Sequence, residues 1–232
     1  MHSSRRSCLR SATARPRLSL GVSEQNIRYA LCLCMLLVSA SSLAAGSHFS
    51  SVKLPRGVEV QIPKGWWLLG KDYNRLIQTS VEAALDLSGI GLDDGEEVNL
   101  IAANSLPRTT YAALRIDSTI PPSATPQEII NLSKSELREI SSYMEQGLIK
   151  LLPLQGNQLL NFYGVHVERV SGHPTLVTRY RRSGPKGPVM VEINQIYPGG
   201  NHELRMNLSY RESEQALWLA VVKKIRTTIK IK

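Results

Sequence analysis

The stretch VMVEINQIYPGGNHELRMNLSY, residues 189–210, decides the fold. Apolar and polar residues alternate on both sides of a Pro198-Gly199-Gly200-Asn201 turn, which is the pattern of two β-strands. The alternating apolar residues are Val189, Val191, Ile193 and Tyr197 before the turn, and Leu204, Met206, Leu208 and Tyr210 after it. We therefore expect strands 189–197 and 203–210, with one buried sheet face and one polar face.

Two further strands are expected immediately upstream, at 159–170 and 175–182. The links between the four segments are short and rich in turn residues, as in Ser171-Gly172-His173-Pro174. Links this short join neighbouring strands that run in opposite directions. Residues 159–210 are therefore predicted to form a four-strand antiparallel meander.

A helix is expected to follow the meander, starting near Ser213. Its apolar residues recur at helical spacing and form a broad stripe: Leu217, Trp218, Val221, Val222, Ile225 and Ile229. Lys223, Lys224 and Arg226 lie toward its C-terminal end, where positive charge is favoured by the helix dipole.

A second helix is predicted before the meander. Thr125-Pro126-Gln127-Glu128 provides an N-cap hydroxyl, a proline at the first helical position and a glutamate three residues after the cap. The helix should run to about Gln146 and end at Gly147. Two strands, 97–104 and 110–116, are expected before it.

The first part of the chain after residue 56 is predicted to form a β-hairpin from strands 57–62 and 66–69, followed by a helix over 73–87. The complete order is strands, helix, strands, helix, four strands, helix. This order indicates an α+β domain in which helices pack on a mostly antiparallel sheet.

Several of these segments resemble the PsbP-like fold. They are V-x-V-x-I-P-x-G-W at 58–66, the strand pair around Asn99 to Ile116, the long middle helix, HPTLVTRYRR at 173–182, and L-S-Y-R-E-S-E-x-x-x-W at 208–218. The family includes thylakoid oxygen-evolving-complex subunits, a Ran-binding protein and bacterial periplasmic proteins of the DcrB type. The resemblance spans most of residues 56–231 and implies an α/β/α sandwich that serves as a non-catalytic binding or assembly module. It assigns no functional residue and no cofactor.

Residues 1–45 have the three parts of a secretory signal. The first 28 residues carry six arginines and one acid, Tyr29–Val38 is almost uninterruptedly apolar, and small residues follow up to Gly46. We predict cleavage after Ala44 or Ala45, leaving one domain over 46–232 in the periplasm or outside the cell. A retained membrane anchor and a bipartite transit peptide leading to the thylakoid lumen are the alternatives, and Val22 is an alternative start of the signal.

The leader also changes the composition of what remains. It holds all three cysteines, so the chain after it has no thiol for a disulfide or a metal. It also holds six of the 28 basic and one of the 19 acidic residues, which leaves 22 and 18, or a net charge of +4 instead of +9. A domain this mildly basic does not favour nucleic-acid binding.

None of the sequence motifs of common enzymes is present, including G-x-S-x-G, H-E-x-x-H, the P-loop and the dinucleotide glycine pattern. His173 and His202 both fall in predicted turns. A hydrolase or metal-binding protein that uses these two histidines and nearby acids is therefore one alternative function. The acidic run Asp93-Asp94-Gly95-Glu96-Glu97 lacks the spacing of an EF-hand, and we interpret it as a solvated loop.

Four arginines form the best candidate binding site. Arg179 and Arg181 lie on one face of a predicted strand, and Arg205 and Arg211 come from a later strand of the same sheet. If the strands bring them together, they make a patch for a phosphate, a carboxylate or an acidic partner. The competing interpretation is a solvated sheet face on which the arginines pair with Glu192 and Glu203.

Trp66 and Trp67 are adjacent, so on a strand they face opposite sides. On a sheet with one buried face at most one of them can lie in the core, and we expect the other to be covered by a helix or to contact a partner. Taken together, the sequence predicts an exported, non-catalytic binding or accessory protein whose partner is another envelope protein or a small anionic ligand. A structural subunit of a membrane-associated complex is the third possibility.

Overall fold

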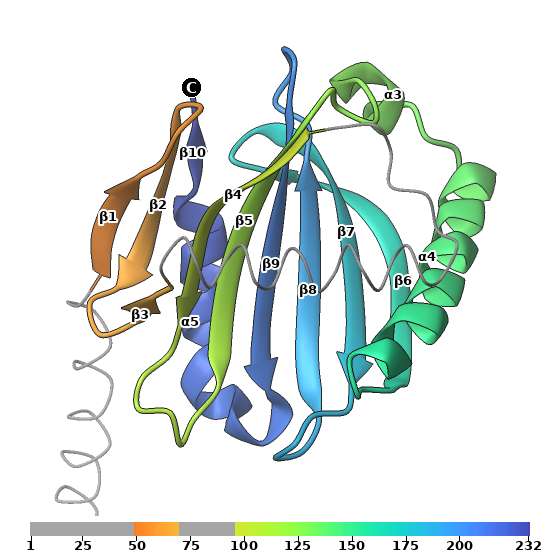
Figure 1. The fold of residues 1–232 in the computed structure, drawn as a ribbon. Coiled ribbons are helices and arrows are strands. Elements are labelled where there is room, and N and C mark those ends of the chain that lie inside the picture. Colours follow the sequence, from red (N-terminus) through yellow and green to blue (C-terminus); the bar gives the residue numbers. More distant parts are fainter. Residues whose placement is uncertain (1–48, 70–95) are drawn as a thin grey trace, which may run out of the picture. The chain divides into compact units, whose positions relative to one another are not determined.

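The computed structural model describes residues 49–69 and 96–232, which contain two antiparallel sheets (Figure 1). The smaller sheet has the order β1-β2-β10, from β1 (Phe49–Lys53), β2 (Val58–Pro63) and β10 (Lys230–Ile231). The larger has the order β3-β4-β5-β9-β8-β7-β6, from β3 (Trp67–Leu68), β4 (Glu96–Asn104), β5 (Ala112–Ile120), β6 (Leu159–Val170), β7 (His173–Arg182), β8 (Val189–Ile196) and β9 (Glu203–Arg211). The expected α+β class is confirmed.

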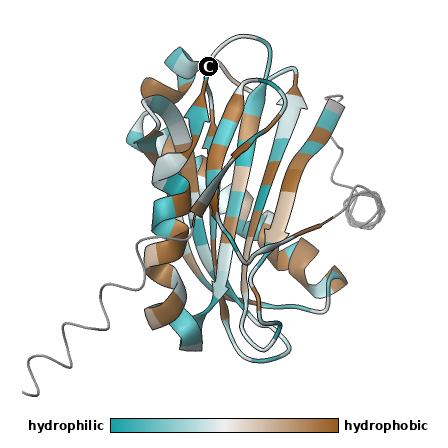
Figure 2. Ribbon diagram, turned by 90° about the vertical axis from the view of Figure 1, so that its left-hand side faces the viewer, coloured by the Kyte–Doolittle hydropathy of each residue, from teal (hydrophilic) through white to brown (hydrophobic). Residues whose placement is uncertain are grey.

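The predicted meander is present as β6 to β9, with each strand antiparallel to the next. The prediction of a single buried face is wrong, however. Ile196 lies opposite Leu204, whereas Val191 lies opposite Ser209, so the two apolar sets of β8 and β9 occupy opposite faces of the sheet. Alternating hydrophobic and hydrophilic bands along the strands are visible in Figure 2.

Both faces of the sheet are covered in part by a helix. On one face, Leu148 and Leu152 of α4 (Lys134–Leu154) form a buried cluster with Tyr180, Val189 and Val191. On the other, α5 (Gln215–Thr228) packs its buried Val222 and Ile225 against the β9 residues of a second cluster, Leu204, Met206 and Leu208. Figure 1 shows α5 behind the sheet and α4 beside β6. The helices therefore lie on opposite sides of the sheet, as in the predicted α/β/α sandwich.

The predicted middle helix is divided into α3 (Pro126–Ile130) and α4. The Thr125–Glu128 capping box is confirmed, and a second one, between Ser133 and Glu136, starts α4. The helix does not end at Gly147 but continues to Leu154. A glycine inside a helix costs only about 1 kcal/mol, which the burial of Leu148 and Leu152 in the following turns offsets.

The N-terminal hairpin was predicted with the wrong partners. Strand β2 pairs with β1 and β10, while Trp67 and Leu68 pair with Asn104 and Ala103 of β4. Gly65 and Trp66 both donate their backbone N–H to the carbonyl of Pro63, so the chain turns away from β2 at this point. Strand β1 was not predicted, and the helix expected over 73–87 lies outside the described residues.

The last helix begins close to the expected position. A short 3₁₀ turn, η1 (Glu212–Glu214), leads into α5, and Trp218 of α5 contacts Trp66 edge-on at 5.9 Å between ring centroids. No helix in 49–69 or 96–232 is long and apolar enough to cross a bilayer.

Candidate functional site

A ring of alternating charges lies on the sheet face that carries α5. Its members are Glu168 on β6, Arg179 on β7, Glu192 on β8 and Arg226 on α5. Arg179 lies directly opposite Glu192 in the antiparallel register, and the helix brings Arg226 over the same strands. Three consecutive strands and a helix that comes later in the chain therefore contribute one residue each.

The ring is closed by ion pairs on all four sides. Arg179 donates from Nε to Glu192 at 2.7 Å and lies 3.4 Å from Glu168 through Nη2. Arg226 lies 3.0 Å from Glu192 through Nε and contacts Glu168 through Nη2. Each arginine thus bridges both glutamates, and each glutamate bridges both arginines.

Two further side chains complete this arrangement, which we call the charge ring. His166 Nε2 lies 2.6 Å from Glu168 Oε1, and Asn194 accepts from Arg226 Nε at 2.8 Å. Burial disfavours the ionised form of Glu168, but hydrogen bonds from Arg226 and His166 outweigh it and lower the pKa of Glu168 to about 2. Glu168 is therefore a fixed anion at neutral pH, suited to accepting hydrogen bonds and not to transferring protons.

A cavity of about 300 Å³ adjoins the charge ring, between α5 and the sheet. Its charged residues are Arg179, Glu192, Arg226 and Lys223. The remaining lining residues are Met190 and Val191 of β8, Leu208 and Tyr210 of β9, and Leu219 and Val222 of α5. We call it the α5 cavity; its volume is at the lower end of the range for small-molecule sites.

The α5 cavity offers an apolar floor and polar groups at its margin. Burial, with the nearby charges of Glu192 and Glu212, raises the pKa of Tyr210, so its hydroxyl stays protonated and can donate a hydrogen bond. Lys223 is exposed. Arg179 is 41% exposed and Arg226 only 18%, so Arg179 is the arginine that can turn toward a bound group.

The four arginines predicted as one patch do not lie together. Arg181 is opposite Met190 and shares the α5 face with Arg179, but Arg205 and Arg211 are opposite Gln195 and Val189 on the other face. Side chains alternate along a strand, and the register between β8 and β9 puts the odd-numbered residues of β9 away from α5. The pairing of Arg179 with Glu192, proposed as the competing interpretation, is present.

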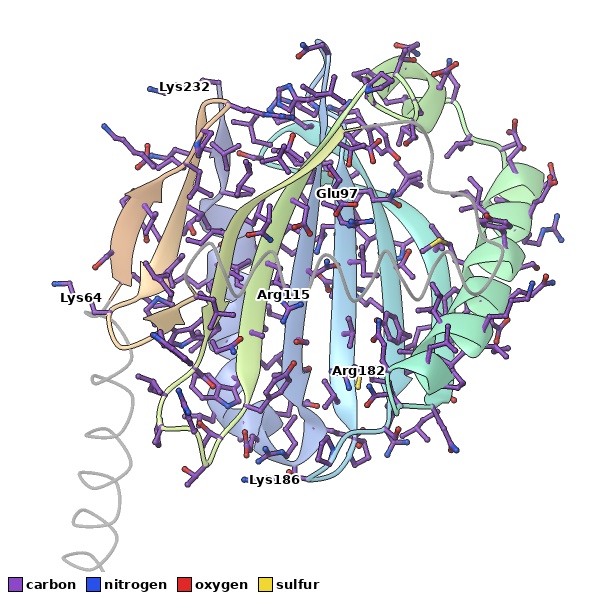
Figure 3. The ribbon with its side chains drawn as sticks, in the orientation of Figure 1. Lys64, Glu97, Arg115, Arg182, Lys186 and Lys232 are labelled. Atoms are coloured by element: carbon purple, nitrogen blue, oxygen red, sulfur yellow. The ribbon has the colours of Figure 1, made fainter. Side chains whose placement is uncertain are left out.

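Arg205 belongs to a second charged cluster on the face opposite the charge ring. It pairs with Glu97 and lies 3.9 Å from Asp117, which also accepts from Asn99 at 2.7 Å. Burial raises the pKa of Asp117, although the charge of Arg205 and the bond from Asn99 oppose this shift. Figure 3 shows Glu97, with Arg115 of β5, on the face of the sheet turned toward the viewer.

Arg181 and Arg211 hold the connection between β9 and α5. Arg181 pairs with Glu212 at 2.8 Å, and Arg211 pairs with Glu214. Glu214 also accepts from the Tyr111 backbone at 2.8 Å and from Trp218 Nε1 at 3.1 Å. These contacts anchor the start of α5 and so position the wall of the α5 cavity.

Solved structures similar to this chain include cyanobacterial PsbP from Synechocystis, at 10% identity and a TM-score of 0.47, with 80% of this chain and 94% of that one covered. LpqN of Mycobacterium tuberculosis, described as involved in cell envelope biogenesis, has 10% identity, a TM-score of 0.41 and coverage of 80% and 86%. A protein of unknown function from Pseudomonas aeruginosa, described as a putative regulator, has 12% identity, a TM-score of 0.39 and coverage of 80% and 99%. All three TM-scores are below 0.5, and the likeness assigns no function to this chain. The sequence matches no protein-family model and no curated protein sequence.

The two tryptophans differ in exposure, although only Trp67 lies on a strand. Trp66 packs against the main core and Trp218, whereas Trp67 is 46% exposed with Arg108 stacked over its ring at 4.5 Å. Nothing in the described residues shows a partner contact at Trp67, so that role stays a prediction.

The histidines predicted for an alternative catalytic or metal role gain no acidic partner in the described residues. Burial and the charge of Arg56 lower the pKa of His202, and His173 begins β7. No cluster of three His, Cys, Asp or Glu side chains able to hold a metal occurs in the described ranges. Asp93 and Asp94 lie outside them.

Sequence reasoning missed His166, Glu168, Asn194 and Arg226 as a connected group. The spacing H-x-E at 166–168 places both side chains on one face of a strand, which is a signal that could have been used. Their meeting with Arg226 depends on where α5 crosses the sheet, and strand alternation carries no information about that crossing.

Proposed function

We propose that this chain is a non-catalytic binding protein of the cell envelope that takes a small anionic ligand into the α5 cavity. The observation that carries the proposal is the cavity itself, where apolar side chains of β8, β9 and α5 meet cationic side chains at one margin. A small molecule with an apolar body and one anionic group matches both parts of this lining.

The location rests on the leader. Its basic start, apolar stretch and small-residue end support export, with cleavage after Ala44 or Ala45. Retention of this segment as an anchor would keep the same domain at the outer side of a membrane, so both outcomes support an envelope role.

The chemistry of the charge ring favours binding over catalysis. Both glutamates are paired with two arginines, and the lowered pKa of Glu168 keeps it ionised near neutral pH, unlike a general acid or base. Arg179, the more exposed of the two arginines, can exchange its contact with Glu192 for a ligand carboxylate or phosphate while Arg226 keeps the ring in place.

Filling the cavity tests the proposal. The probes are linear monocarboxylates of increasing chain length, and the measurement is the shift in unfolding temperature that each produces. Leu219→Trp places a large side chain in the cavity and should abolish any stabilisation. Leu217→Trp is the matched control, because Leu217 is 53% exposed on the same helix and does not line the cavity.

Stabilisation of the unmodified chain and the Leu217→Trp variant, but not the Leu219→Trp variant, supports the proposal. If no carboxylate, and none of the corresponding alkyl phosphates, stabilises the unmodified chain, the cavity does not bind anions. Equal stabilisation of both variants places the binding site elsewhere.

A further inference from the structure

The excess positive charge of the described chain is concentrated in two short segments. Residues 49–64 and 223–232 contain eight Lys and Arg and one acid, Glu59, which gives a net side-chain charge of +7. Residues 65–69 and 96–222 contain twelve basic and twelve acidic residues. The larger part of the described chain therefore carries no net side-chain charge. The composition of the whole chain does not show this difference between its segments.

The fold joins the two basic segments in the β1-β2-β10 sheet. Lys53 of β1 and Lys230 of β10 are both register partners of Glu59 on β2, so the two lysines flank this glutamate. The pKa of Glu59 is lowered by a hydrogen bond from Ser51, and also by the charges of Lys230, Lys53 and Lys232. Three lysines from the two ends of the described chain thus surround one carboxylate.

We define the basic sheet by five lysines: Lys53, Lys64, Lys224, Lys230 and Lys232. All but Lys224 are exposed, and Lys224 lies 4.4 Å from the ring of Phe49. Figure 3 shows Lys64 and Lys232 along the side of the molecule formed by β1, β2 and β10. Among the described residues none of the five forms a salt bridge, whereas the four arginines considered as a patch are all paired with acids.

We propose that the basic sheet binds the anionic headgroups of a membrane surface. Exposed lysine ammonium groups are attracted to anionic lipid by about 1 kcal/mol each near the surface. A lysine is a compact point charge on a flexible stem, suited to the mobile headgroups of a bilayer. Single-stranded nucleic acid would instead favour aromatic platforms between the basic residues, and Phe49, already covered by Lys224, is the one aromatic ring in the two segments.

The position of the basic sheet along the chain favours the same partner. Strand β1 starts eleven residues after Val38, the end of the apolar stretch of the leader. Eleven extended residues span at most about 40 Å. While that stretch is inserted in a bilayer, β1 is therefore tethered within this distance of the headgroups, where a basic sheet would be attracted and a balanced one would not.

Vesicle binding tests the proposal. The chain starting at Gly46 is used, because His48–Lys232 forms one compact unit. We expect it to co-sediment with vesicles that contain phosphatidylglycerol, not with vesicles of phosphatidylcholine alone, and to be released by salt. The triple variant Lys53→Gln/Lys230→Gln/Lys232→Gln should bind about a hundredfold more weakly.

The control removes the same charge elsewhere. Lys134, Lys150 and Lys186 are exposed and lie on α4 and in the link between β7 and β8, so Lys134→Gln/Lys150→Gln/Lys186→Gln should keep most of the binding. Absence of binding to anionic vesicles overturns the proposal, as does an equal loss in both triple variants. Binding to duplex DNA or heparin without binding to vesicles overturns the assignment to lipid. If the Lys53/Lys230/Lys232 variant does not fold, the salt dependence of the unmodified chain decides. Vesicle binding that persists in high salt would overturn the proposal.

Discussion

Arg226 and Arg205 perform the same chemistry on opposite faces of one sheet, with different consequences. Each contacts two acidic side chains, Glu168 and Glu192 for Arg226, and Glu97 and Asp117 for Arg205. Beside Arg226 the sheet and α5 leave a cavity, and a second arginine there is exposed enough to exchange partners. Beside Arg205, Asp117 is only 12% exposed and its pKa is raised by burial. The first cluster is therefore suited to binding, and the second to holding β4, β5 and β9 together.

Removing Arg205 should produce the largest effect on stability. Arg205→Met leaves the carboxylate of Asp117 buried beside the one of Glu97, and breaking such a pair costs about 3 kcal/mol at neutral pH. The loss should become smaller as the pH falls, because the pKa of Asp117 is already raised and protonation removes its charge. Urea unfolding at neutral and mildly acidic pH measures both. A loss that stays constant with pH would show that Asp117 is not the group left uncompensated.

Within the charge ring the two arginines should differ, although each bridges the same two glutamates. Arg226→Met, where the arginine side chain is 18% exposed, is expected to lower the free energy of unfolding by about 2 kcal/mol. Arg179→Met, where it is 41% exposed, should lower it by about 1 kcal/mol or less, because solvent screens an exposed pair. Urea unfolding of the matched pair checks this order. The reverse order would contradict the division into a fixed and an exchangeable arginine.

Glu168→Gln should give an effect that is best seen as a change with pH. The pKa of Glu168 is lowered from 4.5 to about 2 in the folded chain, so its contribution is fully present above about 4.5 and is lost as the pH falls toward 2. The difference in unfolding temperature between the unmodified chain and the variant should be constant near neutrality and shrink over that interval. Glu145→Gln, at an exposed position on α4, is the control and should show no such trend. A difference that does not shrink would mean that Glu168 is not an ion held by the ring.

The local parts of the fold were predictable because they depend on neighbouring residues. Alternation and short turns predicted the strands of the meander, and the Thr125–Glu128 pair predicted the start of α3. The pairing of β2 was not predictable, because its partners β1 and β10 include a strand from the far end of the chain. The face of β9 relative to β8 was predicted wrongly, because six residues separate Ile196 from Glu203 and alternation does not continue through a turn.

In the candidate site, too, the features that depend on neighbouring residues were predicted and those that depend on distant residues were not. The residues of β7 and β9 were recognised as candidates because arginines at alternate positions of a strand are visible in the sequence. Glu192 was named as a partner of Arg179 for the same reason. Arg226 was assigned only to the helix dipole, since its contact with Glu168 spans 58 residues and depends on how α5 packs. The cavity is a property of that packing and has no pattern in the sequence.

The last strand has a consequence for when this domain can finish folding. β10 completes the smaller sheet only when Lys230 and Ile231 reach β2, and the backbone N–H of Lys232 donates to the carbonyl of Gly57. In a chain that crosses a membrane from its N-terminus, β1 and β2 emerge before β10 and pair with it only after Lys230 and Ile231 have crossed. The smaller sheet therefore stays incomplete until β10 has crossed. A tag fused after Lys232 would sit directly on this closure, beside Gly57, where an added Cβ would already approach the Lys232 carbonyl to 3.1 Å.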